Sequence, residues 1–183
     1  KVRNKVERQQ QLGLDPEYKH FVTVGLFTPR KNQAYAFQLA ERLKNNKVKF
    51  HFLGNQAGNF ANYWQPLMAN KPDNCVVWGE RNDVSEFLEA CDVFLFPSKG
   101  DRGNKELNPI AIKEAMEYDD LIKVMYNLDV YCNKYNDEEN MVYLTGDLGS
   151  DTTNIIKKLN LDVLEEECII LGTYPNIKDR VQW

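Results

Sequence analysis

Two adjacent basic residues, Arg30 and Lys31, are the first candidates for chemistry in this chain. They lie in the loop GLFTPRKNQ, which follows an apolar run at residues 20–25 and precedes a helical pattern. An arginine can bind two oxygen atoms at once and a lysine supplies a point charge, so two cations at a helix start suit a diphosphate. A solvated basic turn accounts for the same residues without a ligand, and both interpretations stay open at this point.

Two glutamates follow in the segment KELNPIAIKEAM, residues 105–116. Asn108 is a good N-cap and Pro109 suits the first helical position, so a helix is predicted to begin there. Glu106 then precedes the helix, and Glu114 lies inside it, roughly 7–8 Å further along the axis. A carboxylate on an apolar helix needs a donor such as a ribose diol, and a sugar hydroxyl could meet Glu106. In the alternative interpretation Glu114 faces solvent and Glu106 is favoured by the helix dipole alone.

The segments around these residues alternate between short apolar runs and longer amphipathic ones. Apolar runs predict strands and the amphipathic stretches predict helices. The predicted strands are 20–25, 48–54, 74–79, 92–97, 121–126 and 141–146, and the predicted helices are 32–45, 60–69, 83–90, 108–118 and 151–159. Because apolar residues are consecutive within the strands, both faces of the sheet are expected to be covered. The pattern predicts an α/β fold, a Rossmann-like parallel sheet with helices on both faces.

Length and charge bound the number of domains and the class of partner. A chain of 183 residues suffices for one domain with small additions. We expect an N-terminal helix or linker over residues 1–19, a Rossmann-like body over 20–160, and a C-terminal helix and tail of unassigned role over 161–183. The net charge is −4 and the basic residues are scattered among acidic ones, so nucleic acid is not the expected partner.

The cysteines and the apolar runs indicate the compartment. Four cysteines occur without a CxxC pair, which favours a reducing environment and no zinc site. No run reaches the roughly 18 apolar residues of a membrane span. We expect a cytoplasmic protein, and because the sequence starts at a lysine we also expect it to be part of a longer polypeptide. Contact with a membrane surface through a missing part stays open.

Ligands of open parallel sheets bind at the carboxyl ends of the strands, so the loops there are where a site is expected. These loops are residues 25–33, 54–59, 79–83 and 97–109, together with the segment after Tyr126. The polar stretch 98–105 is compatible with an active-site loop and equally with a plain surface loop.

The ordered series of motifs resembles the C-terminal, donor-binding domain of GT-B retaining glycosyltransferases of family four, the glycosyl transferases group 1. The matching segments are VGLFTPRK, VVWGERNDVSEFLEACDVFLFPS and ELNPIAIKEAM. The separation of Glu106 and Glu114 fits the E-x7-E pattern of that family, and the resemblance covers residues 20 to 150. It implies one half of a GT-B fold, with the acceptor held by an N-terminal domain that this sequence does not contain.

The resemblance also implies roles for individual residues. Lys31 corresponds to the lysine that binds the donor diphosphate, with Arg30 as its auxiliary, in the loop that begins at Gly25. Glu106 corresponds to the catalytic glutamate that faces the transferred sugar. Glu114 corresponds to the glutamate that holds the ribose hydroxyls.

Further donor-binding positions follow from the same resemblance. The tight turn beside the sugar and the phosphates corresponds to Asn108, Pro109 and Ile110. Arg81, with Asp83 near it, corresponds to the loop that frames the base, largely through main-chain groups. Two departures concern the phosphates and the sugar: Leu26 stands where the family has an arginine, and Leu107-Asn108-Pro109 replaces Gly-Phe-Gly.

The implied function is retaining transfer of a sugar from a UDP-linked or GDP-linked donor to an acceptor glycan, lipid or protein. No cofactor and no metal are expected, because cations and backbone N–H groups take their place and the chain has no DxD motif. The isolated domain is expected to be inactive alone. The alternatives are a non-catalytic or degenerate nucleotide-sugar-binding domain and a GT-B-like epimerase or phosphorylase.

Histidine and aromatic residues outside these motifs are expected to be structural. His51 lies in the predicted strand 48–54 and should be a hydrogen-bonded core residue, whereas His20 starts a strand and should lie at the surface. Phe60, Tyr63 and Trp64 recur at helical spacing, which indicates core packing more often than a sugar platform.

Overall fold

The computed structural model describes residues 2–99, 110–126 and 139–162, and all structural statements concern these residues. Six strands form one sheet in the order β3-β2-β1-β4-β5-β6, and every neighbouring pair is parallel. The strands are β1 (Lys19–Val24), β2 (Val48–Leu53), β3 (Cys75–Gly79), β4 (Val93–Phe96), β5 (Ile122–Met125) and β6 (Met141–Tyr143). Each predicted strand is therefore confirmed, with small shifts at the ends.

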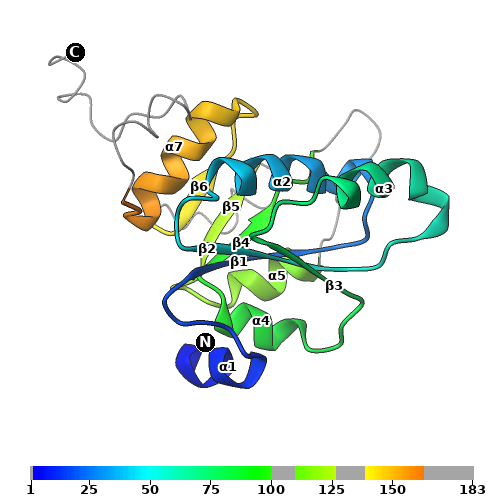
Figure 1. Ribbon diagram of the computed structural model, residues 1–183. Coiled ribbons are helices and arrows are strands. Elements are labelled where there is room, and N and C mark those ends of the chain that lie inside the picture. The colour runs from blue at the N-terminus through cyan, green and yellow to red at the C-terminus, as the bar shows by residue number, and fades with distance from the viewer. Residues whose placement is uncertain (1, 100–109, 127–138, 163–183) are drawn as a thin grey trace, which may run out of the picture.

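Helices cover both faces of this sheet, as Figure 1 shows: α2, α3 and α7 lie on one face, and α4, α5 and α1 lie on the other. Their bounds are α1 (Lys5–Leu12), α2 (Gln33–Arg42), α3 (Ala61–Ala69), α4 (Val84–Ala90), α5 (Ile110–Met116) and α7 (Leu148–Leu159), with short 3-10 turns η1 (Pro29–Lys31) and η2 (Gly58–Phe60). The Rossmann-like α/β prediction is confirmed. None of the helices described is long and apolar enough to cross a membrane.

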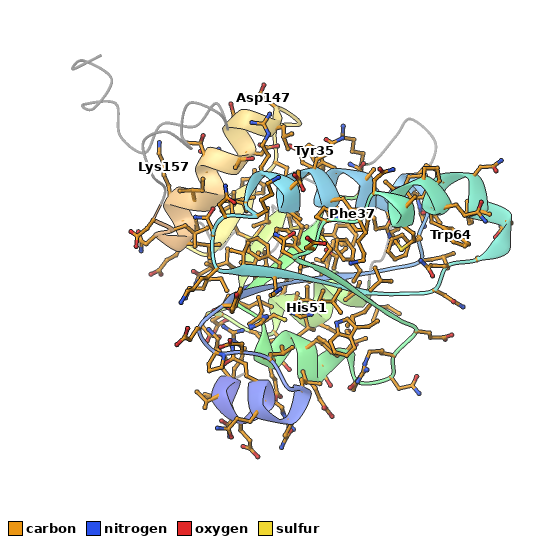
Figure 2. All side chains as sticks on the ribbon, in the orientation of Figure 1. Tyr35, Phe37, His51, Trp64, Asp147 and Lys157 are labelled. Atoms are coloured by element: carbon orange, nitrogen blue, oxygen red, sulfur yellow. The ribbon has the colours of Figure 1, made fainter. Side chains whose placement is uncertain are left out.

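Two apolar layers hold the helices to the sheet. Successive strand residues point to opposite faces, so Phe21 packs with α2 and α7 while Val22 packs with α4 and α5. Figure 2 shows Phe37 of α2 and His51 of β2 on opposite sides of the sheet. This double burial is the reason why the strands carry consecutive apolar residues.

The N-terminal helix α1 packs along α4. The guanidinium of Arg3 donates to the carbonyl oxygens of Leu88 and Cys91 and so caps the C-terminal end of α4. The buried side chain of Gln9 donates to the carbonyl of Ala90 at 3.0 Å. Residues 2–19 therefore belong to the same packed body as the sheet.

The prediction that His20 lies at the surface is wrong. His20 is buried, and its Nε2 lies 2.7 Å from the carbonyl oxygen of Asp15 while its Nδ1 lies 2.9 Å from Nε2 of His51. Nδ1 of His51 in turn accepts from Nε1 of Trp78 at 3.0 Å. The long-range partner His51 and the turn at Asp15 cover a residue whose place at a strand start had indicated exposure.

Only one set of proton positions satisfies this chain of hydrogen bonds. A carbonyl can only accept, so Nε2 of His20 carries the hydrogen and its Nδ1 accepts from His51. The indole of Trp78 can only donate, so Nδ1 of His51 is the acceptor there. Both imidazoles are therefore neutral, and burial lowers the pKa of His20 and lowers that of His51 to about 3. His51 is the hydrogen-bonded core residue that the sequence predicted.

The aromatic residues of α3 are held by the fold. Trp64 packs against the core and donates from Nε1 to the carbonyl of Ala57 at 2.9 Å. The hydroxyl of Tyr63 accepts from the backbone N–H of Ala34 at 3.1 Å. The predicted core packing is confirmed for Trp64, whereas Tyr63 is half-buried and is held by its hydrogen bond to α2.

Candidate functional site

The strand order has its switch point between β1 and β4, and we name the space outside the carboxyl ends of these two strands the crevice. All strands run in one direction, but the order in which they are added to the sheet reverses there, because β1 leads to β2 and β3 on one side while β4 leads to β5 and β6 on the other. The connection after β1 goes to α2 on one face of the sheet, and α5 lies on the opposite face (Figure 1). Ligands of open α/β sheets bind outside the carboxyl ends of the strands at such a reversal.

Lys31 crosses this crevice. It lies in η1, where the Thr28 hydroxyl accepts from the Lys31 backbone N–H at 3.3 Å. Its Nζ stands 5.2 Å from the ring centroid of Phe96, the last residue of β4. A Cβ placed on Gly25 would lie 3.1 Å from Cδ and from Cε of Lys31. Gly25 therefore leaves room for the lysine stem, and the positive φ of 152° at this position also favours glycine.

The two loops that border the crevice are tied together. The buried Ser98 donates from Oγ to the carbonyl of Arg30 at 3.1 Å. Asn32 donates from Nδ2 to the carbonyl of Pro97 at 3.1 Å. Arg30 is exposed and its carbonyl meets the Ser98 hydroxyl, whereas the half-buried Lys31 places its ammonium over Phe96 at the end of β4. Of the predicted residues, Gly25 and Lys31 are therefore in contact, and Arg30 lies beside Lys31 in η1.

A second glycine, Gly54, lies directly against the loop that begins at Gly25. A Cβ on Gly54, which follows β2, would overlap the carbonyl oxygen of Gly25. The backbone N–H of Gly25 donates to Leu53 at 2.8 Å, and that of Gly54 donates to Gly79 at 2.8 Å. The ends of β1, β2 and β3 thus form one continuous backbone layer beneath the crevice.

Arg81 lies beyond β3, the outermost strand on that side. Its Nε and Nη2 donate to the two carboxylate oxygens of Asp83 at 2.7 Å and 2.6 Å. The guanidinium stands 5.0 Å from the ring centroid of Trp78 and 5.2 Å from that of Phe87. The pair raises the pKa of Arg81 and lowers the pKa of Asp83. The side chain of Arg81 is thus engaged within its own loop and against two aromatic rings.

The helix α5 begins at Ile110, whose side chain is 69% exposed. Ile112 and Ala115 face the core, whereas Glu114 is exposed. Glu114 is therefore not a buried carboxylate that requires a donor, and it faces solvent as the alternative interpretation predicted. Glu106, Asn108 and Pro109 lie outside the described residues, so the structure does not test their predicted roles.

A further cluster was missed by sequence reasoning. The exposed Lys99 places its Nζ 5.3 Å from the ring centroid of Tyr126, which follows β5. A Cβ on Gly146 would lie 3.7 Å from the Tyr126 hydroxyl and 3.9 Å from Nζ of Lys99. The sequence signal was limited to the polar loop 98–105 and to the segment after Tyr126, and neither indicates the other.

Metal ligands and reactive thiols are not seen in the part of the chain that the structure describes. Over those residues, no three His, Cys, Asp or Glu side chains gather as a metal site. Cys75 and Cys91 are free and buried, and burial raises the pKa of Cys75 to about 12 and that of Cys91 as well.

Comparison with known families and structures agrees with this geometry. The family described as glycosyl transferases group 1 matches residues 4–140. No curated protein matches the chain at a significant level.

Several solved structures share the fold. WaaG, a glycosyltransferase involved in lipopolysaccharide biosynthesis, superposes with a TM-score of 0.66 at 19% identity, over 94% of this chain and 45% of WaaG. The C-terminal domain of LpcC, a glycosyl transferase group 1 family protein from Francisella tularensis, has a TM-score of 0.64 at 16% identity, over 87% of this chain and 82% of that domain. HepE from Anabaena, solved with UDP-glucose, has a TM-score of 0.53 at 20% identity, over 66% of this chain and 32% of HepE. The chain thus spans less than half the length of WaaG.

Proposed function

Because this chain belongs to the glycosyl transferases group 1 family, we propose that it is the donor-binding half of a GT-B retaining glycosyltransferase. A nucleoside diphosphate sugar binds at the carboxyl ends of β1 and β4. The observation that carries the proposal is Lys31, whose stem passes Gly25 and whose Nζ stands over Phe96 at the strand reversal. HepE was solved with UDP and with UDP-glucose, which favours a UDP-linked donor over a GDP-linked one.

The proposed mechanism is electrostatic. Lys31, with Arg30 beside it, stabilises the departing nucleoside diphosphate while the sugar gains oxocarbenium character. Glu106 orients the sugar, and the turn at Asn108 and Pro109 lies beside it. Glu114 accepts from the ribose hydroxyls, for which its exposed position leaves it accessible. The charge of the diphosphate is neutralised by side chains, so binding should survive a chelator.

The acceptor is bound by a second domain of the same polypeptide in this proposal. WaaG is more than twice as long as the part that superposes, which supports a second domain in the proposed protein. The 183-residue chain alone should bind donor and transfer nothing. A cytoplasmic location, with membrane contact through the other domain, is part of the same proposal.

The test is Lys31→Ala, titrated with UDP in a calorimeter beside the control Lys157→Ala on α7, whose side chain is exposed (Figure 2). Loss of a hydrogen bond to a charged group should weaken UDP binding by about 1.5–3 kcal/mol. Equal affinity of both variants would refute the site.

In the complete protein, Glu106→Gln should lower kcat with UDP affinity nearly unchanged, because its contact is to the reacting sugar. Donor binding without any turnover would instead favour a degenerate binding domain.

A further inference from the structure

Lys99 has no role in the site as argued so far, although it lies just beyond the end of β4. It is exposed, and no carboxylate among the described residues forms an ion pair with it. Its ammonium lies over the Tyr126 ring, and Nζ is 5.3 Å from the ring centroid. Because Phe96 pairs with Met125, Lys99 and Tyr126 follow the ends of two adjacent strands, β4 and β5. An unpaired cation thus stands at the carboxyl end of the sheet, next to the strand over which Lys31 reaches.

The Tyr126 hydroxyl is the second component of this cluster. It is buried, and within the described ranges it has no hydrogen-bond partner. A buried polar group without a partner is unfavourable in a folded protein, so such a group points to a missing ligand. Burial raises the pKa of Tyr126, which keeps the phenol protonated and able to donate near neutral pH.

Gly146 lies beside both of these groups. A side chain at this position would begin 3.7 Å from the Tyr126 hydroxyl and 3.9 Å from Nζ of Lys99. Its φ of +85° also disfavours other residues. A cation and a hydroxyl donor therefore lie beside the same glycine, and the two groups together suit an anionic oxygen.

The nearby carboxylate of Asp151 does not fill this role. It is fully buried and accepts from the backbone N–H and the hydroxyl of Thr145, both at 2.8 Å, and from the Gly146 N–H at 3.0 Å. The hydroxyl of Tyr35 also donates to it. Asp151 thus obtains its donors from its own surroundings, which leaves Lys99 and Tyr126 for a ligand.

We propose that Lys99 and Tyr126 form a second anion subsite, which binds the donor phosphate that is distal to the nucleoside. The assignment of the ligand rests on the proposed function. Lys31 reaches over Phe96 at the end of β4, and Lys99 follows the same strand on the side of β5, so both cations lie at the carboxyl end of β4. A nucleoside monophosphate lacks the distal phosphate and should not engage Lys99.

The test compares Lys99→Met and Tyr126→Phe with the control Lys157→Met, by calorimetric titration with inorganic pyrophosphate, UMP and UDP. Lys99→Met should weaken pyrophosphate and UDP at least about tenfold, which corresponds to about 1.4 kcal/mol, and leave UMP within about twofold. Tyr126→Phe should weaken pyrophosphate and UDP about threefold or more without lowering the melting temperature of the unliganded protein, because the lost hydroxyl has no described partner. A merely structural hydroxyl would lower that melting temperature.

The outcomes separate this inference from the proposed function. Equal pyrophosphate and UDP affinities in Lys99→Met and Lys157→Met would overturn the subsite and leave the donor proposal intact. Pyrophosphate binding that depends on Lys99, in a protein that binds no nucleotide, would keep the subsite and remove the donor proposal. If Lys99→Met weakens UDP-glucuronate but not UDP, the anion is a sugar carboxylate and the phosphate assignment is wrong.

Discussion

The two ends of the sheet differ in how far their polar side chains are hydrogen bonded. At the amino end, the buried carboxylate of Asp92 accepts from the backbone N–H of His20 at 2.8 Å and pairs with Lys5, while both rings of the His20–His51 pair are hydrogen bonded. At the carboxyl end, Lys99 and the Tyr126 hydroxyl have no polar partner among the residues described. Groups of the first kind hold the fold together, and groups of the second kind are available to a ligand.

The largest effect is expected from breaking the amino end with Asp92→Ala. The change leaves the His20 N–H buried without an acceptor and removes the partner of Lys5, so the free energy of unfolding should fall by about 3 kcal/mol. Urea denaturation measures this loss. The exposed Glu17→Ala, which removes only a surface pair with Lys47, is the control.

Ligand binding provides the other half of that experiment. Under conditions where Asp92→Ala is folded, its UDP affinity should equal that of the parent protein, because the carboxyl end is untouched. A large loss of affinity in the folded variant would show that the two ends are not independent.

The neutral histidine chain predicts a pH dependence of intermediate size. Burial lowers the pKa of His51 to about 3 and also lowers that of His20, so below pH about 6.5 the unfolded chain takes up protons that the folded chain does not. Stability is thus complete above that pH and falls as pH decreases, by about 1 kcal/mol per pH unit for His51 between pH 5 and 6, and His20 adds a contribution of the same sign.

His51→Gln checks this assignment, because a glutamine can accept from Trp78 and donate to His20 without titrating. Urea denaturation from pH 5 to 7 should show a shallower slope in the variant than in the parent. The pKa values of the two imidazoles also respond to nearby charges, those of Asp15, Asp92 and Lys5 at His20 and that of Lys49 at His51. An unchanged slope would assign the acid sensitivity to groups other than His51.

The smallest effect is expected at the carboxyl end, from Ser98→Ala. The Ser98 hydroxyl donates to the carbonyl of the exposed Arg30, which water can partly satisfy, so the loss should be about 1 kcal/mol. For a chain of this size that lowers the melting temperature by about 2–4 °C. A fall as large as that of Asp92→Ala would contradict the difference between the two ends.

Local pattern was sufficient to predict the strands and helices but not their partners. The run 83–90 predicts a helix that the structure has as α4, Val84–Ala90, because its apolar residues recur at helical spacing. His20 was misassigned because its burial depends on His51, which lies in another strand. The approach of Lys99 to Tyr126 likewise follows from the register of β4 against β5, and no local pattern encodes that register.

The candidate site was predictable in part for the same reason. Gly25, Arg30 and Lys31 lie within one loop, so their spacing in the sequence already indicated a common place. Lys31 reaches Phe96, however, because of the pairing between β1 and β4, which brings together residues far apart in the chain.

The contact between Gly54 and Gly25 has a consequence for how this protein can diverge. The carbonyl oxygen of Gly25 occupies the position of any Cβ at Gly54, so every other residue there must displace the loop that carries Lys31. Gly54 touches no proposed ligand, yet we expect it to vary less among descendants of this sequence than the exposed Arg30. If the gene is duplicated and one copy no longer has to bind a ligand, we expect substitutions at position 54 to be among the first changes in that copy.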